Sequence, residues 1–405
     1  MNYVPLPIVR VQVGKPLPID VWDGRGNLLL KKGQVIKSVE HREQLERHHP
    51  CAKPHDFKAW ARSYDRLVYS MLRDGASTEE IARVPFPATI LEVDYTVVQG
   101  IVGGWLDMQA VLHGLLYQGS AARLPVARLE ALQARGMELI DADPDACLFE
   151  LFQALADPQL SYCATHALLS ATLCELTARK LGVPDIVRPV LFQAALVMNI
   201  GMAREQDTLT RQNARPDAAQ QQLIQAHPNI SVDILLDFGL VNDDLIDIVR
   251  FHHDTNADLG LARNLECRRI LRAADIFVAK MAARANRVGL SAIGATKDSI
   301  LGMPDEELRI AQAMAHVLGF YPPGTFVALA NGERAVAVKR GPQANTPWVV
   351  SLVGATGLGL NPYVLRDTSD PAFAVQTPIR QDSLKVTVQP ARVARALQGL
   401  QTPKV

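Results

Sequence analysis

The chain has 405 residues, of which 48% are hydrophobic and 21% charged, a balance that is typical of folded proteins and excludes wholesale disorder. Its 42 basic residues equal its 42 acidic residues, so it lacks the basic surplus of proteins whose main task is to bind nucleic acid. Five scattered cysteines argue against a disulfide framework or a zinc ribbon.

The N-terminal sequence and the hydropathy predict a cytoplasmic protein. The opening residues, MNYVPLPIVRV, contain prolines and lack the apolar core of a signal peptide. The best apolar run, 190–198, is interrupted by Gln193 and falls short of the ~18 residues that a membrane span needs. We therefore expect no membrane span and no nucleic-acid partner, while the oligomeric state is left undefined.

The first 60 residues indicate a small β-rich segment. Residues 7–36 alternate apolar and polar side chains around a turn-rich stretch at 23–27, a pattern that predicts a hairpin. Ser38 then stands where an N-cap would begin a short charged helix that ends near His48. Residues 61–140 have a less regular helical pattern with a helix start at Ser77, and we assign them to a helical connecting segment.

Residues 141–319 are helical almost throughout and predict one compact all-α domain. The polar stretch 203–222 is expected to be a loop and a helix start, and Pro228 after His227 is expected to mark a helix end. Helices are predicted over 162–181, 186–199, 231–238, 243–253, 265–287 and 305–318.

From residue 320 to 405 the hydrophobic period changes to two, which predicts a C-terminal β module. The dipeptide Asn331-Gly332 is a strong hairpin signal. Strands are expected at 325–330, 334–339 and 348–353, with a further strand at 385–388, followed by a helix over 391–400. The predicted fold class is therefore mainly α, with a helical domain flanked by a small N-terminal β-rich segment and a small C-terminal β module.

The helical domain contains an unusual set of potential metal ligands. Asp275 lies on an apolar helical stripe with Leu271 and Val278, and burying a carboxylate is costly unless a metal, a histidine or an arginine compensates it. Two interpretations stay open for Asp275: a metal ligand or histidine-orienting group, and a structural ion pair or helix cap. The complete candidate set is His166, His227, His252, His253 and Asp275.

The order of these residues resembles the HD-GYP branch of the HD phosphohydrolase superfamily. That family has a helical His, a His-Asp doublet, a His before Pro, a tandem His and a later Asp, and the resemblance covers residues 150–290. It implies an HD-type helical fold and a metal site built from the five candidate ligands. Active members hydrolyse cyclic di-GMP with two or three metal ions, commonly iron or manganese.

The chain departs from this pattern at the doublet, at the residue after the tandem His and at the GYP motif. The doublet is Met198-Asn199, Asp254 replaces the Glu that follows the tandem His, and 254–260 reads DTNADLG without a GYP motif. Asparagine is neutral and a poor bridge between two cations, and a thioether is a soft ligand unsuited to a hard ion. A two-metal centre is therefore not expected.

These observations predict a catalytically degenerate HD-GYP-like signalling protein that acts by binding cyclic di-GMP, another nucleotide or a protein partner. No residue is assigned as catalytic, and the expected cofactor is either none or a single divalent iron, manganese or zinc ion. The alternative is an active metal-dependent phosphodiesterase with an altered, mononuclear site. A third possibility is a binding module whose flanking β segments contact a partner.

Overall fold

The structure, a computed structural model, describes residues 3–73, 77–90, 101, 103–158, 160–254, 256, 258–285, 287–300, 304–380, 384, 386 and 388–401. The chain divides into two compact units, Met1–Gly100 and Ile101–Val405. Among the described residues, no helix combines the length and apolar character needed to cross a membrane.

The N-terminal unit contains a four-stranded antiparallel sheet in the order β1-β4-β2-β3. The predicted hairpin is present, because the carboxylate of Asp23 accepts hydrogen bonds from the backbone N–H groups of Arg25 and Asn27 and so fixes the turn between β2 and β3. Its elements are β1 (Val4–Pro5), η1 (Ile8–Arg10), β2 (Val21–Trp22), β3 (Leu28–Leu30), α1 (Val39–Arg47), β4 (Cys51–Ala52), α2 (Pro54–Arg73) and α3 (Thr78–Arg83).

Two helix starts in this unit follow their sequence signals. The Ser38 hydroxyl accepts the backbone N–H of His41 at 3.1 Å and caps α1. Ser77 and Glu80 form the reciprocal capping box of α3. The mainly α fold class with a β-containing N-terminal part is confirmed.

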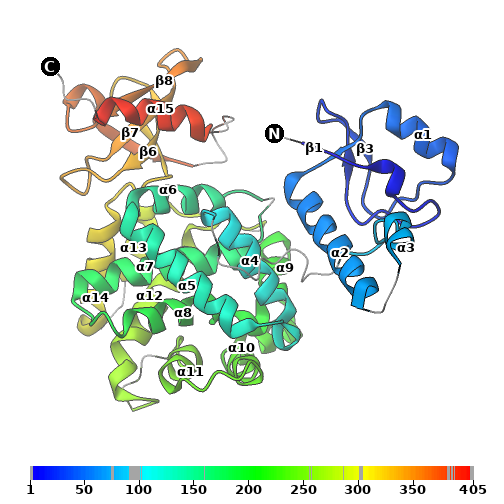
Figure 1. Cartoon of the computed structure of the whole chain (residues 1–405). Helices are drawn as coiled ribbons and strands as arrows, with labels where there is room; N and C mark the ends of the chain where they lie inside the picture. The colour runs from blue at the N-terminus through cyan, green and yellow to red at the C-terminus, as the bar shows by residue number, and fades with distance from the viewer. Residues whose placement is uncertain are drawn as a thin grey trace. The chain divides into compact units, whose positions relative to one another are not determined.

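The second unit begins with the helical domain, shown in cyan to yellow in Figure 1. Its helices are α4 (Trp105–Gln118), η3 (Gly119–Ala121), α5 (Pro125–Ala142), α6 (Pro144–Leu155), α7 (Tyr162–Leu181), α8 (Arg188–Val197), η4 (Ile200–Met202), α9 (Ala203–Arg211), α10 (Ala218–Asp237), α11 (Asp243–Arg250), η5 (Ala262–Asn264), α12 (Leu265–Met281), α13 (Ala292–Ile300) and α14 (Asp305–Leu318).

The central helix of this domain is α7, which has the bounds that the sequence predicted. Residues 163–178 are all buried, and a helix that is buried on every face belongs to the core of a domain. It packs against α8, α12, α14 and α6. Any functional side chain on α7 is therefore held by neighbours on all sides.

Several predicted helix boundaries are wrong. Pro228 does not end a helix, because α10 continues through it to Asp237. The stretch expected to be a loop contains α9, and α12 ends at Met281 rather than at Arg287. Pro228 is tolerated because the side chain of His227 donates a hydrogen bond to the carbonyl of Ile224, which the proline leaves without its helical donor.

The C-terminal module is a five-stranded antiparallel sheet in the order β8-β7-β6-β5-β9, with α15 packed against β8. The Asn331-Gly332 hairpin is confirmed, and Gly332 has a φ of 82° that favours glycine. The sequence did not predict β8 or β9, and residues 385 and 387 of the strand expected at 385–388 lie outside the described residues. The elements are β5 (Phe326–Leu329), β6 (Arg334–Lys339), β7 (Trp348–Val353), β8 (Gly359–Asp367), η6 (Pro371–Phe373), β9 (Val375–Ile379) and α15 (Pro390–Gln401).

Glu333 connects three strands of this module. Its carboxylate accepts two hydrogen bonds from Arg366 on β8, at 2.9 and 2.6 Å. It also accepts the hydroxyl of Ser351 on β7 at 2.6 Å. The hydrogen bonds from Arg366 are the main cause that lowers the pKa of Glu333 to about 2, against the opposing effect of burial.

We predict that the module loses stability in acid. Because the folded pKa of Glu333 lies below its unfolded value, its contribution is complete above the unfolded pKa of 4.5 and is lost as the pH falls toward 2. Hydrogen exchange of the β6–β8 amides, corrected for intrinsic rates, should show this loss. Glu333→Gln should lower protection at pH 7 by about 2 kcal/mol and flatten the pH dependence; a variant that keeps the wild-type pH profile would contradict this assignment.

Candidate metal centre

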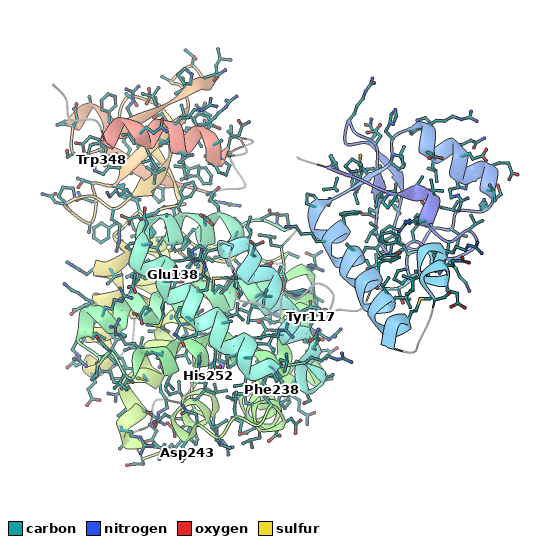
Figure 2. The ribbon with its side chains drawn as sticks, in the orientation of Figure 1. Tyr117, Glu138, Phe238, Asp243, His252 and Trp348 are labelled. Atoms are coloured by element: carbon teal, nitrogen blue, oxygen red, sulfur yellow. The ribbon has the colours of Figure 1, made fainter. Side chains whose placement is uncertain are left out.

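Three histidines, one from a helix and two from a turn, gather at one point of the helical domain. His227 lies on α10, and His252 and His253 lie in the turn that follows α11. One ligand atom from each of the three lies within 4.8 Å of the others. His227 and His252 are fully buried, while His253 is exposed; Figure 2 labels His252 among the helices.

The orientation of His227 comes from the proline next to it. Pro228 has no backbone N–H, so the carbonyl of Ile224, four residues earlier, loses its helical donor. The Nδ1–H of His227 donates to that carbonyl at 2.6 Å. In the neutral ring this places the lone pair on Nε2, so the proline both frees the acceptor and selects the tautomer.

His252 is oriented in the same manner by the end of α11. The last carbonyls of a helix have no partner further along the chain, and the Nδ1–H of His252 donates to the carbonyl of Val249 at 2.7 Å. The Nε2 atom of His252 therefore also carries a lone pair. A hydrogen bond from Nδ1 to a carbonyl is the usual support of a metal-ligating imidazole.

The two Nε2 atoms face each other at 3.2 Å. Burial lowers the pKa of His227 to about 4 and that of His252 to about 3, so near pH 7 neither ring carries the extra proton that a hydrogen bond between them would need. Two lone pairs at this distance repel each other, and a cation between them would turn the repulsion into coordination. The donor set therefore fits one divalent ion.

His166 and Asp275 form a separate buried pair. The Nε2–H of His166 on α7 donates to Oδ1 of Asp275 on α12 at 2.7 Å, and the hydroxyl of Tyr162 lies 3.1 Å from Nδ1 of His166. Burial alone would raise the pKa of Asp275, but the hydrogen bond from His166 and the charges of the nearby histidines hold it below its ordinary value. Asp275 thus orients a histidine, which is one of the two interpretations that the sequence left open.

Of the five candidate ligands, three therefore converge and two pair with each other. Asp275 is still close enough to His252 and His253 for their charges to act on its pKa. The assignment of all five as ligands stays a prediction. Asp254 is exposed and accepts the backbone N–H of Asn256 at 2.9 Å, which closes a local turn.

The turn between α8 and η4 is held against α10 beside His227. The hydroxyl of Ser231 accepts the backbone N–H of Gly201 at 3.0 Å and donates to the carbonyl of Met198 at 2.8 Å. A Cβ on Gly201 would lie 2.8 Å from the carbonyl oxygen of His227. Only glycine allows this close approach, which places the Met198-Asn199 dipeptide next to the histidine helix.

Neither residue of the dipeptide supplies a charge. Met198 is 0% exposed and belongs to the large hydrophobic core of the domain. Asn199 is 5% exposed, and within the described part of the chain neither atom of its side-chain amide has a hydrogen-bond partner. A buried amide without partners costs about 1–3 kcal/mol for each missing bond. Asn199 therefore has an unsatisfied polar group that a bound ligand could satisfy.

The sequence analysis missed the groups that orient the histidines. These are the carbonyls of Ile224 and Val249 and the hydroxyls of Tyr162 and Ser231. Pro228 was an available signal, because a proline inside a helix always frees the carbonyl four residues before it. The sequence instead suggested a helix end at that position.

We predict that Pro228→Ala lowers the affinity for Mn²⁺ about tenfold or more without lowering the free energy of unfolding. The alanine N–H would compete with His227 for the carbonyl of Ile224, and loss of such support typically weakens metal binding 10- to 100-fold. Titration of metal-stripped protein measures the affinity. The matched control is Pro189→Ala, because Pro189 lies in the first turn of α8, where no helical partner is lost. An unchanged Mn²⁺ affinity in Pro228→Ala would show that the carbonyl does not orient His227.

Known proteins show partial likeness to this chain. No protein-family profile matches the chain. The chain is 27% identical over 171 residues to the 3'3'-cGAMP-specific phosphodiesterase 3 of Vibrio cholerae serotype O1, a match that covers 41% of this chain and 36% of that protein, so it spans little more than a third of that relative. Among solved structures, Bd1817, an HDG"Y"P protein from Bdellovibrio bacteriovorus, is 14% identical with a TM-score of 0.43, over 78% of this chain and 99% of that one. The chain is therefore similar, over part of its length, to a named cyclic-dinucleotide phosphodiesterase, in keeping with the resemblance that the order of its histidine motifs indicated.

Proposed function

We propose that this chain binds a cyclic dinucleotide without hydrolysing it and acts as a regulatory protein in bacterial cyclic-dinucleotide signalling. The observation that carries the proposal is the Met198-Asn199 dipeptide. It lies beside His227, and it offers a buried thioether and a neutral amide where the family has a histidine and an acid. A signalling output would then pass to a protein partner.

The electrostatics of the site support one ion rather than two. The converging ligands are three imidazoles, and the buried carboxylate of Asp275 is engaged by His166. Two-metal hydrolases hold their ions about 3.5–4 Å apart, and dications at that distance need anionic bridging ligands to offset their repulsion. Asn199 is neutral and provides no such bridge.

The charge around the site supports a phosphodiester ligand. Arg284 and Arg287 lie close enough to the hydroxyl of Tyr162 for their charges to act on it, and the charge of Arg272 acts on His253. Cyclic dinucleotides carry two negative phosphodiester groups, and arginine is the side chain best suited to bind them. The named substrate of the relative from Vibrio cholerae belongs to the same chemical class.

A second candidate function is a phosphodiesterase that uses a single ion. The observation that favours it is the exposure of His253, which leaves one side of the three-histidine set open, as in catalytic rather than structural metal sites. An ion held there would supply Lewis-acid chemistry. The chain's own residues would then have to position the phosphodiester, a task for which Arg284 beside Tyr162 is the candidate.

We predict no turnover. Incubation of the full chain with 3'3'-cGAMP or cyclic di-GMP and added Mn²⁺ or Fe²⁺ should give no linear product above a protein-free control. Electron paramagnetic resonance of the Mn²⁺-loaded protein should show isolated ions rather than an exchange-coupled pair. Turnover that disappears in an Asp275→Ala variant would overturn the binding-only proposal. If the spectrum of the same protein also shows isolated ions, the result would establish the single-ion phosphodiesterase.

We also predict that two substitutions, at positions 198 and 199, create ligands for a second metal ion. The double variant Met198→His with Asn199→Asp should bind about one further Mn²⁺ ion per chain and should produce the coupled signal. The single variant Met198→His is the matched control, because it adds an imidazole but no bridging acid. If the double variant takes up no more Mn²⁺ than the wild type, the dipeptide does not face the histidines as proposed.

Binding itself is tested by calorimetry with 3'3'-cGAMP and cyclic di-GMP. Arg284→Gln should weaken binding about tenfold, because it removes a charge-assisted hydrogen bond to phosphate. Arg309→Gln is the control: Arg309 is an exposed arginine of the same unit that pairs with Glu266 on α12. Equal affinities of the two variants would show that the cyclic dinucleotide does not bind to the arginines beside Tyr162.

A further inference from the structure

A second cluster of potential metal ligands lies outside the three-histidine set. It consists of His113 on α4, Cys163 on α7 and Asp207 on α9, and one ligand atom of each lies within 4.8 Å of the others. Cys163 and Asp207 are 1% and 3% exposed, whereas His113 is partly exposed. Figure 2 labels Tyr117, one helical turn beyond His113 on the same helix.

Asp207 is a buried carboxylate whose hydrogen-bond donors are all neutral. Its Oδ2 accepts the hydroxyls of Tyr117 at 2.6 Å and Ser161 at 2.8 Å, and its Oδ1 accepts the backbone N–H of Cys163 at 2.6 Å. Within the described ranges, no lysine or arginine forms an ion pair with it. The N-terminus of α7 supplies only about half a positive charge, and a buried carboxylate is costly without a full counter-charge.

We propose that His113, Cys163 and Asp207 bind a zinc ion. On binding, the S–H bond of Cys163 breaks heterolytically, the proton leaves to solvent and a bond forms between sulfur and zinc, with no change of oxidation state. One thiolate and one carboxylate then neutralise the dication, while the imidazole of His113 binds as a neutral ligand. The missing counter-charge of Asp207 is thereby supplied.

The donor types select the metal. A thiolate, an imidazole and a carboxylate form a ligand set that suits zinc, and three protein ligands leave a fourth tetrahedral position for water. Ligand atoms around tetrahedral zinc lie about 3.3–3.8 Å apart. Side-chain rotations that bring the three ligand atoms from within 4.8 Å of one another to that spacing complete the site. Mn²⁺ and Mg²⁺ prefer oxygen ligands and are excluded by the sulfur.

The supporting groups are already in place. The hydroxyls of Tyr117 and Ser161 fix the carboxylate of Asp207, and the hydroxyl of Ser161 also lies 3.2 Å from Sγ of Cys163. Outer partners of this kind orient ligands in metal sites. A zinc ion here would join α4, α7 and α9, and α9 directly follows the turn that carries Met198 and Asn199.

The competing interpretation is a metal-free hydrogen-bonded staple between the same helices. Cobalt distinguishes the two, because Co²⁺ replaces zinc and a thiolate ligand gives an intense charge-transfer band in the near ultraviolet. The three-histidine set contains no sulfur and cannot produce this band. Titration of the metal-stripped full chain with Co²⁺ should therefore show the band, and added Zn²⁺ should abolish it.

Variants assign the band to this cluster. Cys163→Ser should remove it and should lower the bound zinc by one ion per chain, while Cys267→Ser, a change at another buried cysteine, should leave both unchanged. His252→Ala should also keep the band, which separates this site from the three-histidine set. His113→Gln, on a partly exposed residue, should weaken Co²⁺ binding at least tenfold and serves if Cys163→Ser does not fold.

Two results would overturn the proposal. The first is Co²⁺ binding to the wild-type chain without a thiolate band, which would leave Asp207 as part of a hydrogen-bonded staple. The second is a band that survives in Cys163→Ser and in His113→Gln, which would place the thiolate ligand elsewhere. Neither result depends on whether the protein hydrolyses a cyclic dinucleotide.

Discussion

The contact between His227 and His252 constrains the rest of the candidate site. Two buried, neutral imidazoles present lone pairs to each other at 3.2 Å, and each ring is fixed in that orientation by a hydrogen bond from its other nitrogen to a backbone carbonyl. Neither ring can turn without leaving that carbonyl without a partner. A cation between the two Nε2 atoms would relieve the repulsion of their lone pairs, and such local conflicts are found at functional sites.

The Met198-Asn199 turn has a fixed position against the histidine helix. Ser231 holds it to α10 through two hydrogen bonds, and Gly201 allows the two backbones to approach closely. The residue at position 199 is a neutral amide and cannot bridge two cations. We therefore propose that the chain holds a ligand there rather than cleaving it.

The sequence predicted the fold class and much of the local structure because these depend on short-range rules. Periodicity and caps located α7, α14, β6 and β7 at or near their observed bounds. The continuation of α10 through Pro228 was not predictable from local rules, because it depends on a side chain replacing the lost backbone donor. Likewise β8 lies at an edge of the sheet and is fixed by its pairing with β7 rather than by its own pattern.

For the candidate site, the sequence supplied the residue types but not their pairing. The convergence of His227 with His252 and His253, and the separate pairing of His166 with Asp275, both depend on the packing of helices far apart in the chain. The cluster around Asp207 was not recognised at all, because Cys163 and His113 each resemble ordinary helix residues when considered alone. Distances between helices carry that information, and a single sequence does not.

His253 is exposed, whereas the other two histidines of the set are completely buried. The three-histidine set is therefore accessible to solvent through His253. An ion bound by these residues would have its most accessible ligand in His253. Exchange of that ion with the surroundings would then depend on the motion of an exposed side chain, on the fast timescale of exposed rotamers. The occupancy of such a site would follow the supply of metal around the protein, whereas an ion enclosed by the core would be retained from the time of folding.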